Sequence, residues 1–211
     1  MRKPVLMGTT AIIAGALLSL GVASAAEHNS AKVDHPEKQF FKEAAQDGIA
    51  EVALGRLAAK QAASEDVKKF GQRMVDDHSK ANDELKYLAQ SEGITLPVDM
   101  DEKAKATQQR FAKLSGTDFD RAYMEEMVKG HMKDVTAFEQ ESEQAKDPDV
   151  KQWATKTLLT LKEHLDLAHK TAEKVGVKLS AAETSSEKAI NKSTRGSNDA
   201  ALSAPSGLSV R

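Results

Sequence analysis

Four long stretches of this sequence place small or apolar residues alternately three and four positions apart. That spacing gathers them on one face of an α-helix, which is how helices pack in bundles and coiled coils. Aromatic residues make up only 4% of the chain and prolines number five, which favours closely packed helices over a β-sheet. The sequence therefore predicts an all-α four-helix bundle, with long helices at about residues 38–63, 65–92, 118–146 and 148–175.

Residues that begin or end helices stand at the borders of these stretches. Ser64 suits the N-cap of the second helix, and Gly176 suits the position after the fourth. Between the second and third long helices, Asp99 and Glu102 are spaced as a capping box, which predicts a short extra helix to about Leu114. This connection can span roughly 55 Å, more than the roughly 42 Å length of a 28-residue helix. It is therefore long enough to cross from one end of the bundle to the other.

The first 25 residues have the pattern of a secretory signal peptide. Arg2 and Lys3 give a positive start, residues 5–22 are apolar without a charge, and Ala23-Ser24-Ala25 is a small-x-small cleavage signal. Cleavage after Ala25 predicts an exported, periplasmic protein that keeps no stable membrane span. The alternative is an inner-membrane anchor through residues 5–22 if the segment stays uncleaved.

The rest of the chain divides into a leader, a domain and a tail. Residues 26–36 are polar, residues 37–176 hold the predicted bundle, and residues 177–211 are rich in Ser, Ala, Asn, Thr and Lys without apolar periodicity. We expect this low-complexity tail to be disordered, because it has too little apolar surface to bury.

The composition also narrows the classes of function. The formal net charge is −2, and it becomes −4 when residues 1–25 are removed, because they carry two basic residues and no acid. No basic patch with interleaved aromatic residues occurs, so a nucleic-acid partner is not expected. The absence of cysteine excludes thiol chemistry and disulfides. No phosphate-binding loop or GxSxG motif indicates covalent catalysis, and whether the protein is an enzyme stays open.

Ionisable residues stand near the middle of all four predicted long helices. Glu51, His78, His131 and His164 lie within three residues of the helix midpoints, about 4.5 Å of rise at most. All four belong to the apolar seams, so we expect them to meet inside the bundle. Three imidazoles and a carboxylate suit a single transition-metal ion such as Zn²⁺, Cu²⁺, Ni²⁺ or Fe²⁺. Asp134, one turn after His131, is a further ligand candidate.

Other residues near the seam histidines have different expected roles. Asp77 and Glu163 each precede a seam histidine by one residue, about 100° around the helix, which suits outer groups better than direct ligands. Asp166 and His169 form one Asp-x-x-His pair, which we expect on the solvated face of the last helix.

The sequence lacks the usual pattern of a ferritin-like di-iron site. Such sites place a glutamate three residues before a histidine on each of two helices. Here Val75, Val128 and Leu161 occupy the positions three before the seam histidines. A purely structural interpretation also stays open, in which the histidines bond to Glu51, Thr157 or one another, with buried water satisfying the rest.

Several short motifs together resemble an exported bacterial family, catalogued as domain of unknown function 4142. The residues that carry the resemblance are Phe40-Phe41, Glu51-Val52-x-Leu54-Gly55-x-Leu57-Ala58, Met74-Val75-x-Asp77-His78, Phe119-Asp120-x-x-Tyr123, His131-x-x-x-Val135-x-x-Phe138 and Glu163-His164. The match covers about residues 38–176. It implies a ferritin-like four-helix bundle with a short extra helix between helices two and three, and no known reaction.

Two functional hypotheses follow from these observations. The first is a non-catalytic binding or envelope stress-protection module, whose helices face an unknown protein partner or a second copy of the chain. The second is a transition-metal-binding or oxidoreductase-like protein that uses Glu51, His78, His131 and His164.

Overall fold

The computed structural model describes residues 37–181 and 183–185. The predicted signal peptide, the predicted leader and most of the predicted tail lie outside the described residues. All five named elements of the described part are helices.

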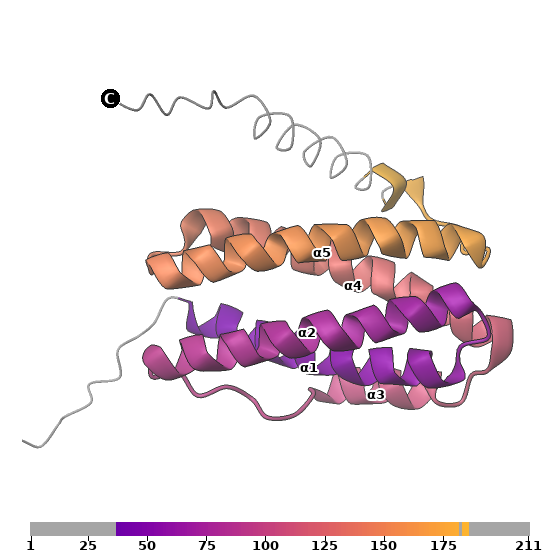
Figure 1. The fold of residues 1–211 in the computed structure, drawn as a ribbon, viewed down its shortest axis with the longest axis horizontal. Coiled ribbons are helices and arrows are strands. Elements are labelled where there is room, and N and C mark those ends of the chain that lie inside the picture. Colours follow the sequence, from indigo (N-terminus) through magenta and orange to yellow (C-terminus); the bar gives the residue numbers. More distant parts are fainter. Residues whose placement is uncertain (1–36, 182, 186–211) are drawn as a thin grey trace, which may run out of the picture. The chain divides into compact units, whose positions relative to one another are not determined.

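Four long helices form two antiparallel pairs. They are α1 (Lys38–Gln61), α2 (Glu65–Ser91), α4 (Gly116–Gln144) and α5 (Pro148–Lys174), and the short α3 spans Glu102–Phe111. Figure 1 shows α1 and α2 as one layer and α4 and α5 as a second layer laid along it. The predicted boundaries of the long helices agree with these to within a few residues, because capping residues stand where the chain turns. Asp147, for example, accepts hydrogen bonds from the backbone N–H groups of Asp149 and Val150.

The connection from α2 to α4 crosses the length of the bundle. From the end of α2 the chain runs beneath α1 and α2 to the opposite end, where α3 lies beside α1 (Figure 1). Two short turns and one long crossover are the topology of ferritin-like bundles. The predicted fold class, an all-α bundle with an extra helix between the second and third long helices, is confirmed.

Glycines bring α1 and α2 unusually close. A Cβ atom built on Gly55 would lie 2.7 Å from the carbonyl oxygen of Gly71, and one built on Gly71 would lie 2.8 Å from that of Gly55. Neither position accepts a side chain unless the helices move apart. This contact fixes how α1 is rotated about its own axis, and therefore which neighbours its other faces meet.

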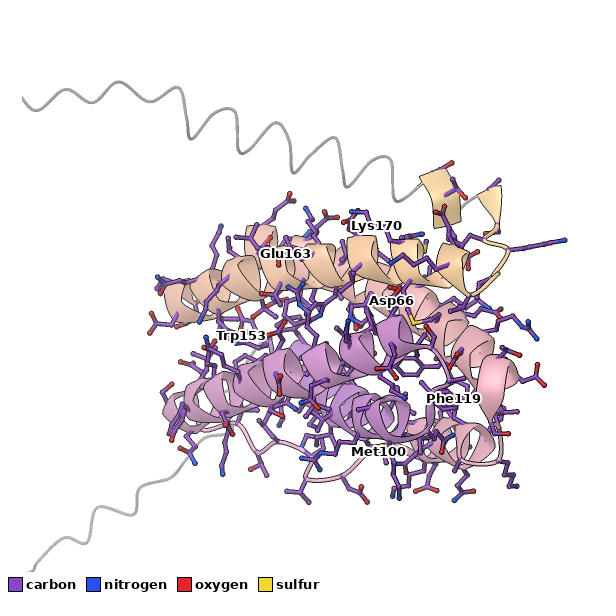
Figure 2. The ribbon with its side chains drawn as sticks, turned by 45° about the vertical axis from the view of Figure 1, so that its right-hand side comes forward. Asp66, Met100, Phe119, Trp153, Glu163 and Lys170 are labelled. Atoms are coloured by element: carbon purple, nitrogen blue, oxygen red, sulfur yellow. The ribbon has the colours of Figure 1, made fainter. Side chains whose placement is uncertain are left out.

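Aromatic side chains concentrate towards the two ends of the core. Phe111, Phe119 and Tyr123 contact one another at one end, with Phe119 and Tyr123 stacked at a centroid distance of 5.7 Å. Trp153 lies against Phe138 near the other end, 5.4 Å between centroids. Figure 2 shows Phe119 and Trp153 at these opposite ends. The middle of the bundle is instead occupied by ionisable side chains.

Buried carboxylates hold the turns between helices. Asp120 of α4 accepts hydrogen bonds from the backbone N–H groups of Ala63 and Ser64, at 2.9 and 2.8 Å. Glu37, just before α1, accepts one from the backbone N–H of Lys146 at 2.9 Å. Each carboxylate thus satisfies main-chain donors that the adjacent helix ends leave without partners.

The described chain continues past the end of α5. Gly176 has a positive φ of 77°, and the N–H of Val177 donates to the carbonyl of Ala172 at 2.9 Å, which closes the helix. Val177 and Leu179 then pack against the core. Among the described residues, no helix combines the length and the hydropathy needed to cross a bilayer.

Candidate metal centre

Three helices each contribute one histidine to the middle of the bundle. His78 comes from α2, His131 from α4 and His164 from α5. Each occupies an inward position. Buried methionines, Met74 and Met127, lie four residues before His78 and His131, about one helical turn away. The common height follows from the helix rise, because all three lie at similar distances from the turns that join the helices.

The three imidazole rings form one compact, buried cluster. Their centroids are 5.7 Å apart for His78 and His131, 5.3 Å for His78 and His164, and 5.4 Å for His131 and His164. One nitrogen from each ring lies within 4.8 Å of the other two. The exposed fractions are 8% for His78, 0% for His131 and 1% for His164. The prediction that these three residues meet inside the bundle therefore agrees with the structure.

Hydrogen bonds fix which nitrogen of two rings carries the proton. Nδ1 of His131 lies 2.9 Å from the carbonyl oxygen of Met127, and a carbonyl only accepts, so Nδ1 donates and Nε2 holds the lone pair. Nε2 of His164 lies 2.8 Å from Oδ2 of Asp77, which leaves the lone pair of His164 on Nδ1.

The remaining nitrogens have no protein partner among the described residues. Nε2 of His78, Nε2 of His131 and Nδ1 of His164 are all buried without a hydrogen bond. An unpartnered buried acceptor costs about 1–3 kcal/mol. In His131 and His164 the unpartnered nitrogen carries the lone pair, and His78 presents one as well in its Nδ1–H tautomer, so the cluster offers a set of nitrogen ligands without a common partner.

A second layer of polar groups orients His164. Asp77 accepts from Nε of Arg73 at 3.1 Å as well as from the imidazole, and Arg73 also contacts Oε2 of Glu163 at 2.7 Å. A carboxylate that accepts the outer N–H of a histidine fixes the ring and makes the inner nitrogen a better ligand. The sequence predicted outer roles for Asp77 and Glu163. Arg73 was missed, although its position four residues before Asp77 is a signal for an ion pair on one helix face.

Burial keeps the histidines neutral. Loss of solvation lowers the pKa of His78, and it lowers the pKa of His131 to about 3. Burial also lowers the pKa of His164, although Asp77 acts in the opposite direction. Desolvation on its own would raise the pKa of Asp77, but hydrogen bonds from His164 and Arg73 outweigh it and lower that pKa. Neutral imidazoles beside an ionised outer carboxylate are the protonation states that bind a metal ion.

The cluster borders a cavity of about 100 Å³ between α2 and α5. Asp77, His78, Thr157 and His164 are among its lining residues. A small ion or a water molecule has room there, so a fourth ligand from solvent is sterically feasible. For ligands at 2.0–2.1 Å, tetrahedral geometry requires nitrogen atoms about 3.3 Å apart.

Glu51 and Asp134 are not part of this cluster. The group of ligand atoms that lie together contains only the three histidines in the described part of the chain. Oε1 of Glu51 instead approaches Gly130 on α4, where a Cβ atom would lie 3.5 Å away. The first cause of the raised pKa of Glu51 is burial, followed by the charges of Asp134, Asp47 and Glu126. The predicted meeting of Glu51 with the three imidazoles is therefore not what the structure shows.

Two further residues differ from the sequence interpretation. His169, expected on the solvated face of α5, has an exposed fraction of 0%. It is therefore a buried residue and does not lie on the solvated face of α5. Tyr123 was missed. It is fully buried, and burial followed by the charge of Glu51 raises its pKa. A polar aromatic residue eight positions before His131 on the same seam was the available signal.

The fold and the cluster together define a class of protein: a ferritin-like helical bundle with three neutral histidines at its centre. The chain belongs to the family described as Domain of unknown function (DUF4142), whose model matches residues 22–171. No curated protein and no solved structure matches it.

Proposed function

We propose that the protein is a transition-metal-binding protein that holds one ion between His78, His131 and His164. The observation that supports this is one buried nitrogen on each ring without a hydrogen-bond partner among the described residues, in a cluster where each ring brings one nitrogen within 4.8 Å of the others. A purely structural cluster is expected to use both nitrogens of each ring in hydrogen bonds, whereas in His131 and His164 only the outer nitrogen has a partner among the described residues.

The donor set suggests which ions bind. Three neutral imidazoles suit borderline ions such as Zn²⁺, Cu²⁺, Ni²⁺ and Fe²⁺ better than Ca²⁺ or Mg²⁺. With three protein ligands and an adjacent cavity, the fourth position would go to a water molecule. The outer pair of Asp77 and Arg73 would hold His164 in the binding tautomer.

The proposed physiological role is binding without covalent catalysis, in an exported compartment. The signal-peptide pattern of residues 1–25 supports export, and it is the sequence feature on which the periplasmic location rests. A buried site that removes a reactive transition-metal ion from solution would protect the cell envelope. This combines the binding and the stress-protection hypotheses in one site.

Metal titration of the full chain tests the proposal. We expect about one equivalent of Zn²⁺ or Co²⁺ to bind the chelator-treated protein, and the free energy of unfolding to rise by about 4 kcal/mol at a thousandfold excess over Kd. His164→Asn should remove both effects. The matched control is His169→Asn, which changes another fully buried histidine on the same helix and should leave binding intact.

The result that would refute the proposal is equally definite. The proposal fails if the wild-type protein binds no ion. It also fails if the stability lost in His164→Asn is the same with and without metal, as expected for His169→Asn. In either case the cluster is polar packing. Elemental analysis of natively purified protein gives an independent measurement of the same question.

A further inference from the structure

A second polar region, made of carboxyl groups, lies where α1, α3 and α4 meet. It lines a pocket of about 160 Å³ that opens to solvent, with Glu51 and Asp134 as its buried acids. Five acidic residues and two lysines line this cavity, and the acids are Asp47, Glu51, Asp101, Glu126 and Asp134. Acidic groups therefore dominate its electrostatics.

Glu51 is the residue that makes this region more than a surface cluster of acids. Its exposed fraction is only 6%, and its Oε2 is buried without a hydrogen-bond partner among the described residues. Its Oε1 faces Gly130, which offers no side chain that would fill the space beside the carboxylate. A carboxylate held in this way costs free energy unless it meets a proton or a cation.

Most of the other charges in the cavity already have partners. Nζ of Lys133 pairs with Asp47 at 2.9 Å, and Arg110 pairs with Glu126 at 3.4 Å. Asp101 accepts from the backbone N–H of Ala104 as the N-cap of α3. Lys103, the other lysine of the lining, has no ion pair with Glu51 or Asp134 among the described contacts.

We propose that this carboxylate cavity binds a hard divalent cation of the Ca²⁺ or Mg²⁺ class, with Glu51 and Asp134 as direct ligands. Asp134 is 8% exposed and lines the same cavity. Carboxylate and water oxygens are the ligands that these ions prefer, and the cavity has room for bound water. None of the three histidines lines this pocket, although Asp134 also lines a neighbouring pocket with His78.

The electrostatics of the two carboxyls support the proposal. Burial, and then the charge of Asp134, raise the pKa of Glu51, while burial and then Asp47 raise that of Asp134 to about 7. Burial and the neighbouring acids therefore disfavour the ionised form of each carboxyl group when no counter-charge is present. A divalent cation would supply that charge and displace the protons, so binding should strengthen as the pH rises.

Calcium is the probe that separates this site from the histidine cluster, because imidazole nitrogen is a poor ligand for it. We expect calorimetric titration of the full, chelator-treated chain at pH 7.5 to show one Ca²⁺ bound, with a Kd of about 10⁻⁴ to 10⁻³ M. Glu51→Gln keeps the shape and removes the charge, and it should weaken binding at least about tenfold. Asp134→Asn should act in the same direction.

Two matched variants complete the experiment. Glu84→Gln removes an acid of α2 that pairs with Lys156 outside this cavity, and it should bind Ca²⁺ like the wild type. His164→Asn should also keep Ca²⁺ binding while it loses Zn²⁺. The proposal is overturned if millimolar Ca²⁺ and Mg²⁺ neither bind nor raise the Tm of wild-type protein. Binding that is unchanged in folded Glu51→Gln overturns it as well.

Discussion

Asp120 and Glu51 are both acids buried inside this bundle, but the protein treats them in opposite ways. Asp120 receives two backbone N–H groups at 2.9 and 2.8 Å, so both carboxylate oxygens have donors. Oε2 of Glu51 has no partner within the described residues, and three other acids raise its pKa in addition to burial. The comparison shows that the fold can satisfy a buried carboxylate where architecture requires one. The unsatisfied groups at mid-height are therefore the better candidates for function.

The largest expected effect on stability comes from removing the satisfied acid. Asp120→Ala deletes two charge-assisted hydrogen bonds and leaves the N–H groups of Ala63 and Ser64 without their acceptor, so the free energy of unfolding should fall by about 3 kcal/mol. Urea unfolding at pH 7 measures this. Asp118→Ala, which removes an exposed acid two residues earlier, should cost less than about 1 kcal/mol. Equal losses in the two variants would mean that Asp120 is no better satisfied than a surface acid.

The next largest effect is the loss of stability at low pH that is caused by the histidine cluster. The pKa of His131 is about 3 in the folded protein, against 6.5 as its ordinary value, so the unfolded chain binds a proton first as the pH falls. The stability that depends on neutral His131 is complete above pH 6.5 and is lost as the pH falls from 6.5 towards 3. Each pH unit costs at most about 1.4 kcal/mol per histidine.

Comparing the wild type with His131→Asn isolates this contribution. Between pH 6.5 and pH 4.5 the wild type should lose about 2 kcal/mol more than the variant, as measured by urea unfolding at both pH values. A metal ion on the cluster should steepen the loss, because protons and the ion compete for the same lone pairs. Identical pH profiles for the two proteins would show that the imidazole is already solvated in the fold.

The sequence was sufficient to predict the fold and the three imidazoles, for a definite physical reason. A seam of small residues fixes which face of each helix points inwards, and the helix rise then fixes the height of every residue. His78, His131 and His164 share both properties. Their convergence required no knowledge of long-range contacts.

Glu51 had the same height and the same kind of seam, yet it belongs to another cluster. The rotation of α1 is set by the close contact of Gly55 with Gly71, and a pattern of small residues does not reveal which neighbour each face will meet. The position of α3 also depends on a crossover whose path is not periodic. These tertiary contacts decide that Glu51 shares a cavity with Asp134 and not with the imidazoles.

The smallest predicted effect reverses the sign of the first. In the metal-free protein, Glu51→Gln should raise the free energy of unfolding by about 1 kcal/mol at pH 7, because the variant removes a desolvated, repelled carboxyl while Asp120→Ala removes a satisfied one. An acid whose pKa is raised by folding binds its proton more tightly in the folded state. Its unfavourable contribution is therefore absent below the ordinary value of 4.5 and grows as the pH rises above it.

Urea unfolding of the wild type and Glu51→Gln at pH 7 and pH 4.5, both in chelator, tests this reversal. The advantage of the variant should be present at pH 7 and nearly disappear at pH 4.5, because the folded wild type then carries a protonated Glu51 and the unfolded chain is about half protonated there. Millimolar Ca²⁺ at pH 7 should reduce or abolish the advantage by stabilising only the wild type. If the variant is instead less stable than the wild type in chelator at pH 7, the prediction is wrong. Glu51 would then stabilise the fold, as Asp120 does.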